Sequence, residues 1–249
     1  MKVSVLIPIL DTEPQLAETV ARLRDACRDL DLEVLLVVDV PHPSREDAAR
    51  AGNDEIAEGV GGRAIYRVGQ RGFGSAIRVG FAEATGQAMI PYMGDACDDP
   101  ADIPALVARM EAGWDVVAGS RYMPGGRIVG NTFKQRMSKL YCRLVRLVGG
   151  PPIHDVANAF KAYRRSVLDS VTTVAESYDL SVELTVKAHQ KGFSVTEVPT
   201  TWTNRELGES NWRPSQELRR YSRWLLLALT GRRRARAGAV PVIERSEEG

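Results

Sequence analysis

Short apolar runs alternate with helix-like segments along the chain, and this alternation is what most limits its possible folds. The runs rich in β-branched residues predict strands at 3–9, 33–40, 88–93, 114–118 and 193–198. The spacing of apolar residues predicts helices at 14–29, 72–84, 102–111, 134–148 and 181–190. Strands and helices that alternate in this way form a mostly parallel central sheet with helices on both faces. The sequence therefore predicts an α/β fold.

The composition excludes several classes of protein. Of the 249 residues, 44% are hydrophobic and 26% are charged, a balance too apolar for a disordered chain. The 33 Lys and Arg residues against 32 Asp and Glu residues give a net charge of +1, which argues against nucleic acid as a partner. No apolar run reaches the roughly 20 residues of a membrane-spanning helix, and the run after Met1 is too short for a signal peptide. Three cysteines without CxxC spacing favour a reducing compartment, so we expect a cytoplasmic protein.

Several acidic residues directly follow predicted strands, where sheets of this kind bind their ligands. Asp39 can accept hydrogen bonds from a base or a ribose, although an ordinary turn residue would look the same. Asp95, Asp98 and Asp99 follow the third strand, and carboxylate oxygens are ligands that Mg²⁺ and Mn²⁺ prefer. An exposed acidic loop has the same composition. The glycine-rich helix start around Gly74 would let backbone N–H groups approach a phosphate.

Several motifs follow one another in a specific order. They are Val-Leu-Ile-Pro (5–8), Val-Val-Asp (37–39), Gly-Phe-Gly-Ser-Ala (72–76), Ala-Thr-Gly (84–86), Gly-Ser-Arg-Tyr (119–122), Asn-Ala-Phe-Lys (158–161) and Glu-Val-Pro-Thr-Thr-Trp (197–202). This order resembles family 2 glycosyltransferases of the GT-A fold. It is most similar to their dolichol-phosphate mannose synthase-like, or polyprenyl-phosphate glycosyltransferase, branch. The match spans about residues 3–230.

The resemblance implies a domain organisation and an activity. One GT-A domain would span 1–230, with a nucleotide-sugar-binding half at about 1–120 and an acceptor half at 121–230. A basic and then disordered tail would follow at 231–249. The implied reaction is inverting transfer of a hexose from GDP-mannose or a UDP-hexose to a polyprenyl or dolichyl phosphate, with Mg²⁺ or Mn²⁺ on the donor diphosphate. Two alternatives remain: transfer to a soluble hydroxyl acceptor, and a degenerate nucleotide-sugar-binding protein without turnover.

The resemblance also implies roles for individual residues. The nucleotide sugar would be bound by Pro8, Ile9, Asp11, Glu13, Asp39, Gly74 and Asp95. Asp95 would hold the metal ion, with Asp98 or Asp99 helping directly or through water. Arg121, Arg136 and Ser138 would face the acceptor phosphate, since a guanidinium group binds phosphate with two parallel hydrogen bonds.

Departures from the family pattern occur at two places. Met93 stands where the first Asp of the DxD motif is expected, and a thioether is a poor Mg²⁺ ligand. Cys97 stands where the synthases often have another polar ligand. The segment 40–44 replaces a common Asp-Gly-Ser and leaves the nucleotide base open.

Two carboxylates are candidates for a general base, should the reaction need one. Glu183 is the first candidate and Asp179 the second, because the two are spaced i,i+4 on one predicted helix. A solvated helix face is the alternative interpretation. Asp155 fits a structural role and an acceptor-site role equally well.

The segment 221–229 is aromatic and leucine-rich and lies between arginine clusters. It predicts an amphipathic helix at a membrane surface, with arginines on anionic headgroups and Trp224 and leucines in the acyl boundary. A core helix followed by a basic tail is the alternative. We therefore expect a peripheral protein on the cytoplasmic face of a membrane.

Overall fold

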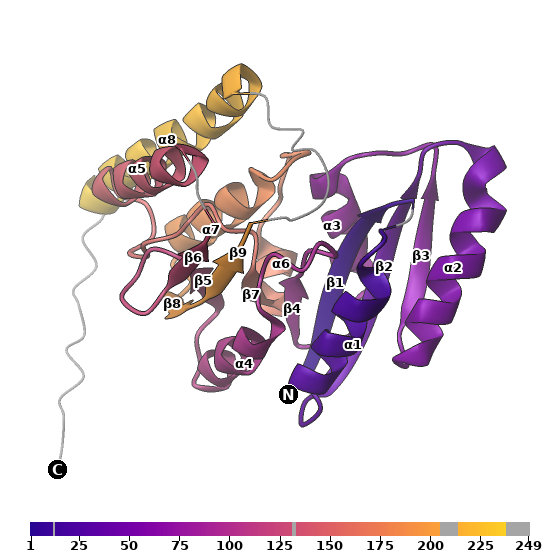
Figure 1. Cartoon of the computed structure of the whole chain (residues 1–249). Helices are drawn as coiled ribbons and strands as arrows, with labels where there is room; N and C mark the ends of the chain where they lie inside the picture. Colours follow the sequence, from indigo (N-terminus) through magenta and orange to yellow (C-terminus); the bar gives the residue numbers. More distant parts are fainter. Residues whose placement is uncertain (12, 131–132, 205–213, 238–249) are drawn as a thin grey trace, which may run out of the picture.

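The computed structural model describes residues 1–11, 13–130, 133–204 and 214–237, so the tail predicted to be disordered at 238–249 lies outside it. Its centre is a seven-stranded sheet with the strand order β3-β2-β1-β4-β7-β5-β8 (Figure 1). The strands are β1 (Lys2–Leu10), β2 (Asp31–Val40), β3 (Arg63–Val68), β4 (Ala88–Pro91), β5 (Val116–Ser120), β7 (Lys161–Arg164) and β8 (Val195–Pro199). Every neighbouring pair is parallel except the two that β7 makes. The predicted mostly parallel α/β fold is confirmed.

A small second sheet lies beside the main one. It pairs β6 (Arg127–Val129) with β9 (Thr201–Thr203) in parallel, and a single bridge joins Asp98 to Trp202 of β9. The loop that follows β4 is therefore attached to the second half of the chain.

Helices cover both faces of the main sheet. They are α1 (Leu16–Ala26), α2 (Glu46–Gly59), α3 (Phe73–Glu83), α4 (Ile103–Glu111), α5 (Phe133–Leu147), α6 (Arg165–Ser170), α7 (Leu180–Gln190) and α8 (Pro214–Ala237), with short 3₁₀ turns at Pro43–Arg45 and Pro100–Asp102. Residues of α1, α2 and α4 share one core cluster, whereas residues of α3, α5, α7 and α8 share the other.

The alternation of side chains along β1 explains why its sequence is apolar throughout. Val5 and Ile7 belong to the core under α1 and α4, while Leu6 belongs to the core under α3 and α7. Successive side chains of a strand point to opposite faces, so a strand covered on both faces is a continuous apolar run. Because neighbouring strands run parallel, the polar residues that follow them lie at the same edge of the sheet.

The helices α5 and α8 lie alongside each other, beyond α7 and away from β3 and α2 (Figure 1). The Tyr141 ring of α5 packs edge-on against the Tyr221 ring of α8 at 5.2 Å, and the Tyr141 hydroxyl donates to the Tyr221 carbonyl oxygen at 3.0 Å. Within the described part of the chain, no helix is both long and apolar enough to cross a membrane.

Candidate functional site

The ends of β1 and β2 meet through their backbones. The Asp11 amide donates to the Asp39 carbonyl oxygen at 3.0 Å, as expected for residues that end neighbouring parallel strands. Asp11 has a positive φ of 62°, an unusual conformation for a residue other than glycine. It is held there because Asn53 donates to its carbonyl oxygen at 2.9 Å and Arg45 pairs with its carboxylate at 2.5 Å.

Asp39 links β2 to β3 and to the start of α3. Its Oδ1 accepts from Arg67 at 2.7 Å, and its Oδ2 accepts from the Gly72 amide at 2.9 Å. Burial raises the pKa of Asp39, and the Arg67 guanidinium opposes this rise. The sequence did not point to Arg67, because its strand carries too little apolar pattern to be predicted.

The remaining residues assigned to the nucleotide sugar have different environments. Pro8 is half-buried within β1, the side chain of Ile9 lies in the core, and Glu13 is half-buried in the turn before α1. A Cβ on Gly74 would lie 2.5 Å from the Ala175 carbonyl oxygen, and the Gly74 amide donates to the Glu176 carbonyl oxygen at 2.9 Å. Gly74 thus permits the start of α3 to approach the segment before α7.

The three aspartates after β4 have separate environments. Oδ1 of Asp95 accepts from the Cys97 amide at 3.2 Å, next to Ala96 with its positive φ of 55°. Asp99 caps the following 3₁₀ turn through the Ala101 amide at 3.1 Å. Asp98 is only 3% exposed, and its Oδ1 has no hydrogen-bond partner among the described residues.

Asp98 is a strong candidate for holding a cation. Burial raises its pKa to about 7; the Arg121 guanidinium lowers this value and the Asp95 carboxylate raises it. A buried carboxylate oxygen without a partner is costly, and a divalent cation would satisfy it. Among the described residues, no three His, Cys, Asp or Glu side chains gather as a ligand set. The pair Asp95 and Asp98 instead fits Mg²⁺, which proteins usually bind with one or two carboxylates plus substrate phosphates.

Asp95 and Asp99 also line a hollow of about 320 Å³. The other lining residues come from the start of α1, from the same loop and from the end of β9: Gln15, Glu18, Thr19, Arg22, Ala96, Cys97, Thr201, Thr203 and Asn204. The acidic loop therefore borders a space large enough for a small polar group.

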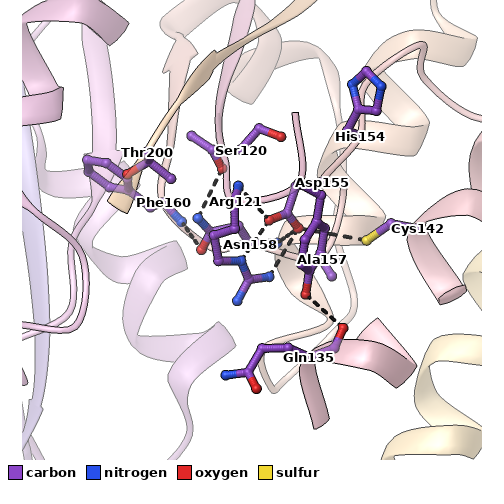
Figure 2. Close-up of polar contacts among 12 residues, drawn as sticks. Ser120, Arg121, Gln135, Cys142, His154, Asp155, Ala157, Asn158, Phe160 and Thr200 are labelled. Carbon is purple, nitrogen blue, oxygen red and sulfur yellow. Dashed lines mark hydrogen bonds and ion pairs between the residues drawn. The ribbon is translucent and has the colours of Figure 1, made fainter. Parts of the chain in front are cut away.

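Arg121 is fixed by Asp155 at the end of β5 (Figure 2). Its Nε donates to Asp155 Oδ2 at 2.7 Å, its Nη2 donates to Oδ1 at 3.1 Å, and its amide donates to Oδ2 at 3.1 Å. The backbone N–H of Asn158 donates to Oδ1 of the same carboxylate at 3.1 Å. Burial alone would raise the pKa of the fully buried Asp155. The charges of Arg121 and Lys161, together with the hydrogen bonds from Arg121, outweigh burial, and the net pKa is lowered. Asp155 therefore holds the arginine in place.

A buried lysine supports the loop that carries Asp155. Lys161 is 0% exposed, and its ammonium group donates to the carbonyl oxygens of Val156, at 3.0 Å, and Asn158. Burial lowers the pKa of Lys161 to about 8. The sequence marked this position only as the last residue of the Asn-Ala-Phe-Lys motif at 158–161.

The loop after β5 and the first turns of α5 come together. The Tyr122 hydroxyl donates to the Gln135 carbonyl oxygen at 3.2 Å and hydrogen-bonds with Ser138, and Arg121 lies 5.1 Å from the centre of the Tyr122 ring. Arg136 is exposed on the same helix. The structure thus places Ser138 close to the loop of Arg121.

Both base candidates on α7 are fully buried, so the interpretation of a solvated helix face is wrong. Glu183 Oε2 accepts from the amides of Val174, at 2.9 Å, and Ala175, at 2.7 Å, and Oε1 pairs with Lys187 at 2.6 Å. Glu183 therefore anchors the segment before α7.

Asp179 attaches α8 to α7. Its Oδ2 accepts from Arg223 and from the Trp224 indole N–H, both at 2.8 Å. Trp224 is only 5% exposed, so the prediction that it enters the acyl boundary of a membrane is wrong. The reason is its hydrogen bond to a buried carboxylate, which a sequence does not reveal. Trp202 is half-buried on β9, and Trp212 lies outside the described residues.

Comparison with known proteins gives three informative relatives. Polyprenol monophosphomannose synthase of Mycolicibacterium smegmatis is 34% identical over 215 residues, which cover 83% of this chain and 79% of that protein. Undecaprenyl-phosphate 4-deoxy-4-formamido-L-arabinose transferase of Klebsiella pneumoniae is 32% identical over 85% of this chain and 62% of its own length. Dolichol-phosphate mannosyltransferase of Pyrococcus furiosus is 31% identical over 84% of this chain and 59% of its own length. The chain thus spans less than two thirds of the last two relatives.

A solved structure supports the fold assignment. Glucosyl-3-phosphoglycerate synthase from Mycobacterium tuberculosis, in complex with Mn²⁺, UDP and phosphoglyceric acid, matches with a TM-score of 0.62 and 19% identity over 93% of this chain and 78% of that one. This likeness confirms the GT-A fold. Residues 4–172 match the family described as glycosyl transferase family 2. By this match and by its 34% identity to the polyprenol monophosphomannose synthase of Mycolicibacterium smegmatis, the chain belongs to glycosyl transferase family 2.

Proposed function

We propose that the protein transfers a hexose from a nucleotide sugar to a polyprenyl phosphate with inversion at the anomeric carbon. The observation that carries the proposal is the guanidinium of Arg121, fixed by Asp155 beside the buried carboxylate of Asp98. The fixed Arg121 guanidinium and the carboxylates of Asp95 and Asp98 suit a reaction in which a donor diphosphate meets an acceptor phosphate. The names of the relatives point to the same class of acceptor.

The donor would bind at the ends of β1 and β2. Of the residues proposed to bind the donor, Pro8 and Ile9 belong to β1, and Asp11 and Glu13 follow it. Asp39 would accept hydrogen bonds from the nucleoside while Arg67 keeps its carboxylate in place. The contacts of Gly74 and Gly72 fix the start of α3 beside this position.

Asp95, with help from Asp98, would hold Mg²⁺ or Mn²⁺. When bound, such an ion neutralises charge that develops on the leaving diphosphate. Met93 would supply no ligand in this arrangement, and the buried Asp98 oxygen would take the place of the missing carboxylate. Asp99 already caps a turn through its Oδ1, so it would contribute less to metal binding than Asp95 and Asp98.

The acceptor side favours a phosphate over a hydroxyl group. A phosphate monoester is already anionic near neutral pH, so it needs positioning rather than a strong base. Arg121, Arg136 and Ser138 would supply that positioning. A hydroxyl acceptor would need a base such as Glu183, which is buried and bonded to two amides and Lys187.

The setting we propose is the cytoplasmic face of a membrane, with contact through α8 and the arginines in the second half of that helix. The arginines of this region suit anionic headgroups. Among the α8 leucines whose side chains the structure describes, Leu226 and Leu229 are exposed, by 62% and 39%.

A transfer assay tests the proposal. Labelled GDP-mannose, UDP-glucose, UDP-galactose and UDP-GlcNAc are each incubated with the protein, Mg²⁺ or Mn²⁺, detergent and a short polyprenyl phosphate. We expect label in the organic phase with one donor, lost with a chelator and with Asp95→Ala but retained with Asp25→Ala, an exposed aspartate on α1. Nucleotide binding with label only in the aqueous phase would favour a soluble acceptor, or a protein without turnover.

A further inference from the structure

One side of α5 exposes a continuous stripe of large apolar side chains. Phe133, Met137, Leu140, Leu144 and Leu147 are 69%, 46%, 50%, 40% and 70% exposed. Their steps of four and three residues place all five on one face of the helix. A stripe of this spacing normally lies against a core, but here it points away from the protein.

The opposite side of α5 is the side that packs on the protein. Cys142 and Val145 are buried in the core, and Tyr141 contacts α8. The exposure of the stripe therefore follows from the way the helix is attached, because these inward residues fix its orientation.

The charge of α5 is entirely positive. Its ionisable side chains, apart from one tyrosine and one buried cysteine, are Lys134, Arg136, Lys139, Arg143 and Arg146, and it contains no Asp or Glu. At 3.6 residues per turn, Arg136, Lys139, Arg143 and Arg146 form a row next to the apolar stripe. An apolar stripe bordered by a row of cations is typical of a helix that lies in the headgroup region of an anionic bilayer.

We propose that the stripe of α5, together with Leu226 and Leu229 of α8, lies on a bilayer surface that contains anionic lipid. A second copy of the chain fits this surface less well, because two such helices face to face would bring their rows of cations together. The inference deepens the proposed function, since Arg136 and Ser138 stand on this same helix. It rests on that function for the identity of the acceptor but not for vesicle binding itself.

Vesicle flotation with the full chain tests the docking surface. The vesicles contain phosphatidylcholine with or without phosphatidylglycerol, and no polyprenyl phosphate or nucleotide sugar is present. We expect binding to the anionic vesicles that weakens with added salt. Leu140→Ser with Leu144→Ser should reduce the partition coefficient at least about tenfold, because two leucines no longer enter the acyl boundary.

Matched controls separate the stripe from general effects. Leu10→Ser removes a leucine of similar exposure, 51%, from the end of β1, and it should leave vesicle binding unchanged. Arg143→Glu with Arg146→Glu should abolish the preference for anionic lipid. Arg24→Glu on α1 with Arg28→Glu just after that helix, across the sheet, should not. Circular dichroism and transfer to a water-soluble short-chain acceptor show that the stripe variant is folded.

The outcomes distinguish this inference from the proposed function. Vesicle binding that is unchanged in the stripe variant, or absent in the parent protein, overturns the inference. A parent dimer that becomes a monomer in the stripe variant overturns it in favour of self-association. Stripe-dependent vesicle binding without any sugar transfer leaves the inference standing and removes the proposed function.

Discussion

Arg121 and Asp155 form an ion pair in which the carboxylate is fully buried. Removing one partner of such a pair leaves an uncompensated charge, which is more costly than removing both. Asp155 holds one side of the Arg121 guanidinium, through hydrogen bonds from its Nε and its Nη2. The Arg121–Asp155 pair therefore contributes both to the stability of the fold and to the position of the proposed phosphate-binding guanidinium.

Asp155→Asn should lower the free energy of unfolding by about 3 kcal/mol, because Arg121 keeps its charge without a partner. The double variant Asp155→Asn with Arg121→Gln should recover part of this loss. Urea titration of the parent, the two single variants and the double variant measures both effects. Strictly additive losses would show that the two side chains do not depend on each other.

Lys161 gives the stability a defined dependence on pH. Burial lowers the pKa of Lys161 from its usual 10.5 to about 8, so between these values the unfolded chain binds a proton that the folded chain lacks. The contribution of this group to the free energy of unfolding therefore rises with pH. Compared with Lys161→Met, the parent should become more stable by about 1 kcal/mol between pH 7 and pH 9. Urea titrations at the two pH values decide this, and parallel profiles would refute it.

At the scale of elements, α7 organises the second half of the chain through its two buried carboxylates. Asp179 holds α8, and Glu183 holds the segment before α7. Both carboxylates are therefore engaged in contacts that hold the fold together.

Glu183→Gln distinguishes this structural role from general-base catalysis. With a phosphate acceptor, we expect a loss of about 2 kcal/mol in stability from the weakened contacts to Lys187 and two amides, with kcat reduced less than about tenfold. A catalytic base would instead cost about 10²- to 10⁴-fold in kcat with little change in stability. Thermal unfolding and kcat, measured at a temperature where the variant is folded, separate the two roles.

The elements that the sequence predicted are those with strong apolar periodicity. The buried β1 and β2 were found within two residues of their bounds. The rule that ligand sites lie at strand ends singled out Asp39, and the structure joins its carbonyl oxygen to the Asp11 amide. The short β7 and the edge strand β3 were missed, because Lys161 and Arg67 interrupt their apolar pattern.

The partners of the site residues could not be predicted, because they depend on contacts across the fold. Asp155 lies 34 positions from Arg121, and Arg67 lies 28 positions from Asp39. The exposed stripe of α5 was missed for another reason: its spacing is the same as that of a helix packed on a core. Only the packing of Cys142 and Val145 shows which side faces inward.

At the scale of the whole molecule, a ligand that binds only the folded state stabilises it. With the metal–nucleotide complex at 100 times its Kd, the free energy of unfolding should increase by about 2.7 kcal/mol, which raises Tm by roughly 5–10 °C. Thermal unfolding with GDP or UDP and Mn²⁺ measures this increase and identifies the base.

Addition of a chelator, or Asp95→Ala, should remove most of this thermal shift. A shift that persists in full under both conditions would exclude Asp95 from binding the metal–nucleotide complex. The variant Asp25→Ala again serves as the exposed control on α1.

The place of β7 in the sheet has a consequence for the synthesis of the chain. This strand lies between β4 and β5 and pairs with both of them, although it follows β5 by about 40 residues. A nascent chain that ends near residue 120 therefore has an open edge at β4 and no partner on that side for β5. Exposed strand edges promote aggregation. The ribosome must deliver residues 161–164 before the central sheet can close. A chain released near residue 120 would therefore hold β3, β2, β1 and β4 with an open edge and would leave β5 unpaired.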